Sequence, residues 1–196
     1  YLMKKLNGKL KYNIAVIISG RGSNLKSIIN HSLKKKTLYK VKLIISNRQG
    51  AKGLLIAKKM HIKNYCIDFT RSKKLGEMVI EILKKNNIKL ICLAGFMKIL
   101  PEYFIKLFHG KIVNIHPSLL PKYKGLDTHK RVILNNEKYT GCTIHYVNKF
   151  LDSGKIISQK RVRITKKDTA KSIEKKVLKI EHKIYPKTID KILSSP

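Results

Sequence analysis

The stretch NIAVIISGRGSN, residues 13–24, decides the fold of this 196-residue chain. Its first six residues are a continuous apolar run, which is typical of a central strand buried on both faces. A glycine-rich turn follows, and a helix is predicted to begin near Leu25. At such a junction the amides of the helix N-terminus can receive a phosphate, and glycines let the backbone approach it. The stretch therefore predicts a parallel sheet with an anion site at one end of its central strand.

The turn itself, residues 19–24, matches neither common phosphate motif. Gly20 and Gly22 would be the first two glycines of a dinucleotide-binding fingerprint, but Leu25 stands where the third is required. No Gly-Lys-Ser/Thr sequence follows, so the turn is not a P-loop. Ser23 or Asn24 is expected to cap the helix. An ordinary strand-to-helix turn is the alternative interpretation.

The rest of the chain alternates between apolar runs and helical patterns. Such alternation predicts an α/β fold with a doubly wound, mostly parallel sheet. Segments 140–147 and 155–164 flank a turn and predict an antiparallel hairpin, whose first strand alternates as if half-buried. A long C-terminal helix is predicted over residues 168–193. The other predicted strands are 40–46, 63–67, 88–93 and 111–115, and the other helices are 51–60, 73–86, 101–108 and 129–135.

The organisation along the chain indicates one domain, residues 13–196, after a basic N-terminal extension of residues 1–12. No linker rich in proline, glycine and serine divides the sequence, and no apolar run reaches the roughly 20 residues of a membrane span. Cys66, Cys92 and Cys142 are predicted to be buried thiols of a reducing compartment. The histidines show no metal-ligand spacing. We therefore expect a cytoplasmic protein without a metal.

The net charge of +33 is the outlier of the composition. Such charge is typical of proteins that bind nucleic acids or membranes. However, only six of the 44 basic residues are arginine, the residue type that clamps phosphates and reads bases bidentately, and the lysines are spread along the chain. We therefore favour a compositional origin of the charge. In either case the field should attract an anionic substrate.

A second stretch, VNIHPSLLP over residues 113–121, carries a candidate active site. Asn114 and His116 share one side of a predicted strand end, because side chains of a strand alternate between faces. An amide and an imidazole placed there can hold a carbonyl and stabilise charge that develops on its oxygen. Pro117 and Pro121 stiffen the adjacent loop. The alternative is a histidine that only satisfies backbone groups of the turn.

Taken together, three motifs resemble the signature of the folate-dependent formyltransferases. They are NIHPSLLP with KYKG (residues 114–125), SGRGSN (residues 19–24) and LAGFM (residues 93–97). The resemblance runs from about Asn13 to about Ile189 and is closest to the members that formylate glycinamide ribonucleotide in purine synthesis. It implies a Rossmann-like formyltransferase fold. It also implies transfer of a formyl group from 10-formyltetrahydrofolate to the amine of that ribonucleotide, through a tetrahedral intermediate.

The resemblance implies a set of site residues as well. Asp152 matches a family Asp-x-Gly-x-Ile pattern in which the Asp approaches the His, so we expect it to raise the pKa of His116 and keep the ring cationic; a turn-forming Asp is the alternative. His145 could assist, although an ordinary strand residue is the favoured interpretation. The implied catalytic residues are Asn114, His116 and Asp152, the ribonucleotide residues are Gly22, Ser23, Asn24 and Glu181, and the folate residues are Lys73 (with Arg71 as the alternative), Met97, Lys98, Ile99, Leu100 and Asn114.

Other functions remain open at this stage. Methionyl-tRNA formyltransferases share the core of the 113–121 motif, but they normally carry a further C-terminal domain. Formyltetrahydrofolate hydrolases share the catalytic trio and carry an extra N-terminal domain. A basic nucleic-acid binder is the alternative outside enzymes, and the shortage of arginine and of clustered aromatics argues against it. We expect small-molecule substrates, no nucleic acid, no membrane, and a monomer or homodimer.

Overall fold

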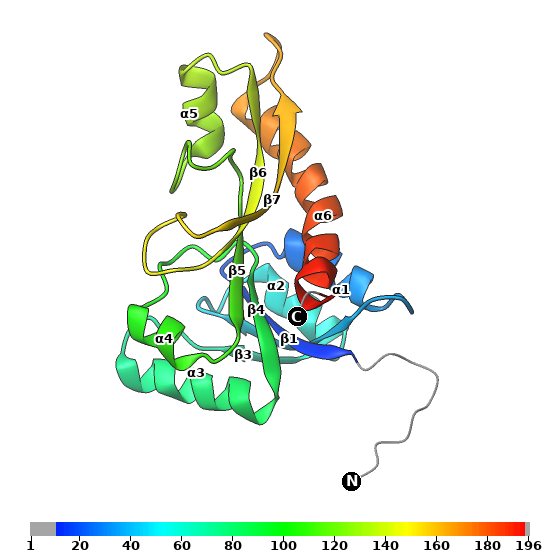
Figure 1. Cartoon of the computed structure of the whole chain (residues 1–196), viewed down its shortest axis with the longest axis vertical. Helices are drawn as coiled ribbons and strands as arrows, with labels where there is room; N and C mark the ends of the chain where they lie inside the picture. Colours follow the sequence, from blue (N-terminus) through cyan, green and yellow to red (C-terminus); the bar gives the residue numbers. More distant parts are fainter. Residues whose placement is uncertain (1–10, 195–196) are drawn as a thin grey trace.

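The computed structural model describes residues 11–194, and one seven-stranded sheet runs through this part of the chain (Figure 1). Its strands are β1 (Tyr12–Ile18), β2 (Tyr39–Ser46), β3 (Lys63–Cys66), β4 (Ile88–Leu93), β5 (Lys111–His116), β6 (Tyr139–Tyr146) and β7 (Ile156–Arg163). The helices are α1 (Ser23–Ser32), α2 (Lys52–Lys59), α3 (Lys73–Lys85), α4 (Glu102–Leu107), α5 (Thr128–Leu134) and α6 (Ala170–Ser194).

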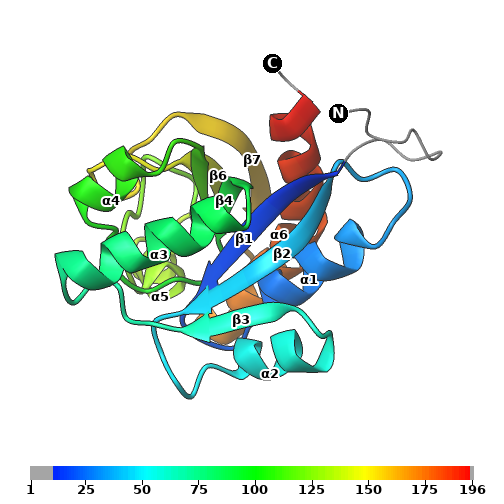
Figure 2. The same cartoon turned by 90° about the horizontal axis from the view of Figure 1, so that it is seen from below.

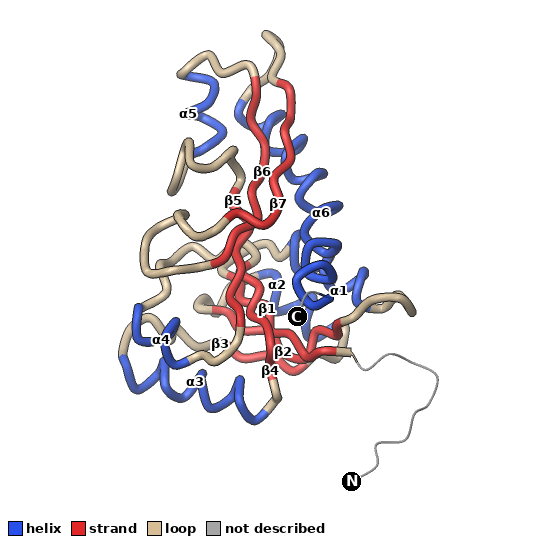
Figure 3. The backbone as a smooth tube through the Cα atoms, viewed as in Figure 1, coloured by secondary structure: helices blue, strands red, loops and turns tan. Residues whose placement is uncertain are grey.

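The sheet has the strand order β3-β2-β1-β4-β5-β6-β7. The first five strands pair in parallel, whereas β6 and β7 are antiparallel and form a hairpin that rises away from the parallel part (Figure 3). The chain order reverses between β1 and β4, which is where open α/β sheets place their ligands. The predicted doubly wound α/β fold with a C-terminal hairpin and long helix is confirmed.

Helices cover both faces of the sheet, as Figure 2 shows from below. One apolar core joins the sheet to α1, α2 and α6, and a second joins it to α3 and α4. β1 lies between β2 and β4, and its residues Ile14 to Ile18 are completely buried. This two-sided burial explains the uninterrupted apolar run that identified the strand. No helix in residues 11–194 is long and apolar enough to cross a membrane.

Strand β6 differs from its predicted half-buried state, because residues 140–145 are all buried. Cys142 and Ile144 pack in the core with α6. On the other face, Thr143 Oγ1 donates to the carbonyl of Ser118 and accepts from the amide of Leu120. The proline-rich loop therefore covers the side of the strand that was expected to face water.

Lys11 and Tyr12 belong to the packed structure, although the sequence placed them in the extension. The Tyr12 amide donates to the carbonyl of Leu38, so β1 begins one residue earlier than expected. The ammonium of Lys11 donates to the carbonyls of Ser32, the last residue of α1, and of Lys34 just beyond it. The expected extension otherwise lies outside the described residues. The predicted burial of Cys66 is wrong, because this residue is exposed on edge strand β3, whereas Cys92 and Cys142 are buried as predicted.

The start of α1 corrects another expectation, because neither Ser23 nor Asn24 caps the helix. Gly22 occupies the N-cap position with a left-handed φ of 74°, and no side chain caps the first turn. A Cβ on Gly22 would lie 2.7 Å from the Cα of Gly53 on α2. The turn therefore needs glycine at residue 22 both for its backbone conformation and for the close approach of α2.

The two glycines of this turn allow a matched stability test. Gly22→Ala should lower the free energy of unfolding by about 2 kcal/mol or more, because it combines a left-handed φ with a backbone clash. Gly20→Ala is the control, since a Cβ there meets nothing within 4 Å and its φ is not positive. Urea unfolding of both variants measures the difference. Equal stability of the two would contradict the described turn.

Candidate active site

A cavity of about 1090 Å³ opens at the carboxyl ends of β1, β4 and β5. The turn before α1, the 93–100 segment, the hairpin turn 147–152 and the starts of α5 and α6 also line it. All the predicted catalytic and ribonucleotide residues line this cavity: Gly22, Ser23, Asn24, Asn114, His116, Asp152 and Glu181. The structure therefore gathers residues that are up to 159 positions apart in the sequence, from Gly22 to Glu181.

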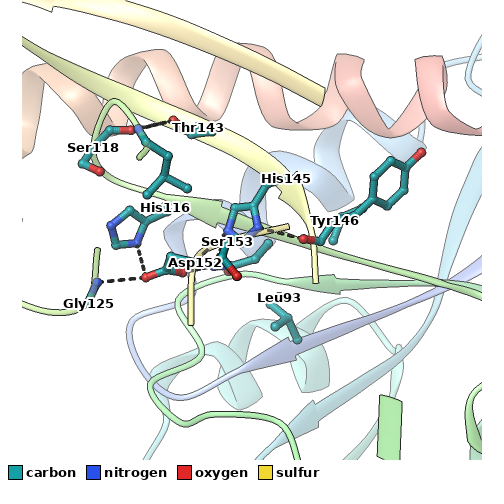
Figure 4. A network of polar contacts seen from close by, with 12 residues as sticks. Leu93, His116, Ser118, Gly125, Thr143, His145, Tyr146, Asp152 and Ser153 are labelled. Carbon is teal, nitrogen blue, oxygen red and sulfur yellow. Dashed lines mark hydrogen bonds and ion pairs between the residues drawn. The ribbon is translucent and has the colours of Figure 1, made fainter. Parts of the chain in front are cut away.

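Asp152 is the centre of the polar network in this cavity. Figure 4 shows its carboxylate between His116, Gly125 and His145. Oδ2 lies 3.3 Å from His116 Nδ1 and accepts from the Gly125 amide at 2.9 Å. Oδ1 accepts from Asn114 Nδ2 at 3.4 Å and lies 3.6 Å from His145 Nε2. One carboxylate thus joins the two residues of the 113–121 motif to the hairpin.

The hairpin turn explains how Asp152 reaches this position. Asp152 adopts a left-handed φ of 44°, which Asp tolerates better than most residues. Gly154 lets the turn approach β6, since a Cβ there would lie 1.7 Å from the carbonyl oxygen of Tyr146. The side chain of Asp152 is only 8% exposed, so its charge needs the donors around it. The turn therefore requires Gly at residue 154 for its close approach to β6, and Asp at residue 152 suits both the backbone conformation and the buried network.

His145 belongs to the network, which corrects the favoured interpretation of an ordinary strand residue. Its Nδ1 donates to the carbonyl of Tyr146 at 2.8 Å. Its Nε2 lies 3.3 Å from Nδ2 of Asn114 and 3.6 Å from Oδ1 of Asp152. The cause is the register of the sheet, because Asn114 on β5 stands directly opposite His145 on β6. His145 thereby orients both Asn114 and Asp152.

His116 is enclosed by acceptors on both sides of its ring. Nε2 donates to the carbonyl of Tyr123 at 2.8 Å, and Nδ1 faces Asp152. Burial lowers the pKa of His116, while the Tyr123 carbonyl and the Asp152 carboxylate act to raise it. Asp152 thus acts on this pKa in the expected direction, but the pKa is lowered overall, so the expectation of a cationic ring is wrong. Desolvation of a ring that is only 7% exposed outweighs the nearby charge.

The pKa of Asp152 lies below its ordinary value. Burial alone would raise it, but hydrogen bonding to His145 and to the Gly125 amide, together with His116, has the larger combined effect. The carboxylate is consequently ionised at neutral pH. The site thus pairs an ionised Asp152 with a neutral His116, a combination in which the carboxylate can accept a proton and then pass it to the ring.

The ribonucleotide residues predicted from the resemblance lie together on one wall. Asn24 Nδ2 donates to Glu181 Oε2 at 2.7 Å, across the contact between α1 and α6. Burial raises the pKa of Glu181, and the amide of Asn24 opposes this effect. Asn24 Oδ1 is buried and has no hydrogen-bond partner. Gly22 and Ser23 present the uncapped N-terminus of α1 beside this pair.

The predicted folate segment, residues 97–100, forms another part of the cavity wall. Met97 and Ile99 are exposed by 61% and 62%, whereas Leu100 is buried. Ser19 Oγ accepts from the Met97 amide at 2.9 Å and donates to Asn47 Oδ1 at 2.6 Å. Buried Ser19 therefore ties the turn before α1 to the 93–100 segment, a role that its sequence position alone did not indicate.

The basic residues expected for the folate tail are placed differently from one another. Lys98 lines the cavity, and its ammonium lies 2.9 Å from Asp68 Oδ2. Arg71 shares Asp68, at 3.4 Å, so it stands close to Lys98. Lys73 is exposed, lies 3.8 Å from Glu77 and does not line the cavity. Arg71 does not line the cavity either, but it shares Asp68 with Lys98, which does.

Comparison with known proteins identifies the family. The sequence profile described as formyl transferase matches residues 12–189. The chain belongs to the formyl transferase family. This membership and the predicted class of enzyme, a formyltransferase, are confirmed.

The relatives of this formyl transferase carry consistent names. The phosphoribosylglycinamide formyltransferase of Haemophilus influenzae is 39% identical, over 90% of this chain and 84% of that protein. The crystal structure of phosphoribosylglycinamide formyltransferase from Anaplasma phagocytophilum has a TM-score of 0.85 at 40% identity, covering 91% of this chain and 84% of that one. The trifunctional purine biosynthetic protein adenosine-3 of Gallus gallus is 37% identical over 96% of this chain, which spans only 19% of that protein.

The charge states of the site lead to a titration experiment. In this formyl transferase, the ring of His116 should titrate below about pH 6.5, followed by NMR of the imidazole protons. Asp152→Asn should lower this pKa further, because the carboxylate charge that raises it is lost. Because folding favours the neutral ring, this contribution to stability is present above pH 6.5 and is lost as the pH falls.

Glu102→Gln is the control for this titration, since Glu102 is an acid outside the cavity. It should leave the pKa of His116 unchanged. A wild-type pKa above 6.5, or a pKa that rises in Asp152→Asn, would contradict the described balance of burial and charge.

Proposed function

We propose that this formyl transferase moves a formyl group from 10-formyltetrahydrofolate to the amine of glycinamide ribonucleotide. The observation that carries the proposal is that Asp152, His116 and Asn114 line one cavity together with the N-terminus of α1 and the 97–100 segment. The printed names of the relatives support the acceptor, since they specify phosphoribosylglycinamide. The ribonucleotide and the folate would then both reach the cluster within this cavity.

The ribonucleotide side of the proposal uses residues of α1 and α6. Gly22, Ser23 and Asn24 would hold the phosphate through amides of the uncapped helix N-terminus. Glu181 would accept hydrogen bonds from ribose hydroxyls, beside the free acceptor of Asn24. A raised pKa at Glu181 and the absence of an acidic residue from the first turn of α1 both reduce repulsion of a phosphate.

The folate side uses the backbone of Met97, Lys98, Ile99 and Leu100 for the pterin. The Met97 amide already donates to Ser19, so the pterin would bind the remaining backbone groups of this segment. Lys98 and Arg71, which share Asp68, would meet the carboxylates of the folate tail, with Lys73, which pairs with Glu77, as the other candidate. Asn114 would contact the formyl group.

The proposed reaction begins when the amine nitrogen attacks the formyl carbon and the carbonyl electrons move to its oxygen. The amide of Asn114 would donate to this oxyanion. Its present bonds to His145 and Asp152 are long, at 3.3 and 3.4 Å, so a stronger acceptor can replace them. His116 would release Nε2 from the Tyr123 carbonyl and donate to the same oxygen.

Asp152 would handle the proton that the attacking amine must lose. An ionised carboxylate accepts this proton, directly or through water, and Nδ1 of His116 lies 3.3 Å away to receive it. The ring, then protonated on both nitrogens, donates a proton to N10 of the folate as the bond from the formyl carbon to N10 breaks. The lowered pKa of His116 suits this sequence, because a neutral ring can first accept and then donate.

The proposal assigns no metal to the reaction. Among residues 11–194, no three His, Cys, Asp or Glu side chains are grouped as metal ligands. The cytoplasmic location, the lack of a nucleic-acid partner and a monomeric or homodimeric state stay predictions.

A transfer assay tests the reaction. Purified protein is mixed with 10-formyltetrahydrofolate and one of three acceptors: glycinamide ribonucleotide, methionyl-tRNA or water. Release of deformylated folate should require the ribonucleotide. Release with tRNA would contradict the proposed acceptor and give the +33 charge a function, and release with water alone would indicate a hydrolase.

Substitution of the cluster should separate catalysis from folding. Asn114→Ala, His116→Ala and Asp152→Asn should each reduce kcat by about 10²–10³, because each removes an oxyanion donor or the proton acceptor. Circular dichroism should show near-normal folding. His109→Ala is the control, since His109 is exposed and does not line the cavity. A wild-type rate from any of the three would remove that residue from the mechanism.

A further inference from the structure

An ion pair lies in the cavity between the turn before α1 and helix α6. Arg21, in the turn before α1, contacts Glu174 on α6 through its guanidinium. Both residues line the cavity, and their side chains are 75% and 38% exposed. Surface ion pairs of this kind contribute little to stability. Arg21 can therefore exchange Glu174 for a stronger partner with little loss of stability.

Glu174 and His129 are also close enough for each to influence the pKa of the other. Hydrogen bonding to Arg21 is the main cause that lowers the pKa of Glu174, and His129 adds to it. Burial lowers the pKa of His129, against the effect of Glu174. His129 Nδ1 is buried without a hydrogen-bond partner, on the wall of the same cavity. An ionised Glu174 thus stands among one cation and one neutral ring.

The negative charge of Glu174 would repel the phosphate of the proposed ribonucleotide. A phosphate monoester at the N-terminus of α1 would carry nearly two negative charges close to Glu174. Arg21 belongs to the turn that forms this N-terminus, and its planar guanidinium matches phosphate geometry. Asn24, buried with a free Oδ1 on the same wall, is a second sign that this end of the cavity receives a ligand.

We infer that Arg21 and Glu174 form an exchangeable phosphate clamp. Without ligand, Glu174 holds the guanidinium over the N-terminus of α1. When a phosphate monoester binds, Arg21 leaves Glu174 and donates to the phosphate oxygens. Glu174 then sets the affinity, since the ligand must compete for Arg21. The inference deepens the proposed function and rests on its placement of the ribonucleotide phosphate.

Calorimetric binding of ribose 5-phosphate and of inorganic phosphate tests the clamp without any formyl donor. Arg21→Gln should raise the Kd for both about tenfold, and Arg21→Lys should recover only part of this loss. Glu174→Gln should lower the Kd about threefold. Arg163→Gln is the control, because this substitution removes the same charge from an exposed arginine on β7 that does not line the cavity. Its Kd should equal that of the wild type.

The double variant Arg21→Gln/Glu174→Gln separates exchange from simple repulsion. If Glu174 competes for Arg21, Glu174→Gln should improve binding less when Arg21 is absent. An equal improvement in both backgrounds would overturn the exchange, because Glu174 would then only repel the ligand. An unchanged Kd in Arg21→Gln, or no phosphate binding by the wild type, would overturn the clamp itself.

The transfer assay distinguishes failure of the clamp from failure of the proposed function. If the wild type formylates the ribonucleotide but Arg21→Gln has the same KM for it, the function stands and the clamp fails. If no acceptor is formylated while Arg21 still governs phosphate binding, the clamp stands and the reaction fails. Circular dichroism of each variant ensures that the compared proteins are folded.

Discussion

The shared carboxylate of Asp152 is the interaction on which this site depends. It accepts hydrogen bonds from the backbone amide of Gly125 and the side-chain amide of Asn114, and it lies against the rings of His116 and His145. A buried anion is stable only with such donors around it. The same contacts bring the proline-rich loop, the end of β5 and the hairpin turn together. The requirement to satisfy one charge therefore organises three separate segments.

The fold makes this arrangement possible by placing strand ends at one edge. The carboxyl ends of β1, β4 and β5 supply the glycine turn, the 93–100 segment and the 113–121 motif. Tyr185 of α6 donates to the carbonyl of Leu93 at 2.9 Å and lies 3.3 Å from that of Val113. Ser19 links the first of these ends to the second. The two proposed substrate walls are thus held in fixed relation by buried hydrogen bonds.

The sequence predicted most of the fold because its strands are apolar on both faces and its turns contain glycine or proline. The predicted helix 73–86, for example, directly follows Ser72, a residue type that caps helices, and the side chain of Ser72 accepts from the amide of Leu75. The cap of α1 could not be predicted, since only the packing of Gly22 against Gly53 excludes a side-chain cap there. The burial of β6 depends on a loop whose path over Thr143 is a tertiary contact.

The sequence predicted which residues lie together in the cavity, but it did not predict the charge state of His116. Asn114, His116 and Asp152 came from motifs, and a strand register placed His145 beside them. The sign of the His116 pKa shift could not be read from neighbouring residues, because desolvation by distant parts of the chain dominates it. Arg21 and Glu174, 153 positions apart, meet only in the folded structure.

The most direct test of this account is a crystal structure with glycinamide ribonucleotide and an unreactive analogue of 10-formyltetrahydrofolate. The account predicts that the formyl oxygen lies about 3 Å from Asn114 Nδ2 and from a ring nitrogen of His116. It also predicts that the contact of His116 with the Tyr123 carbonyl is broken, with the ribonucleotide amine beside Asp152. A formyl group bound away from this cluster, or an amine separated from Asp152 by another side chain, would contradict it.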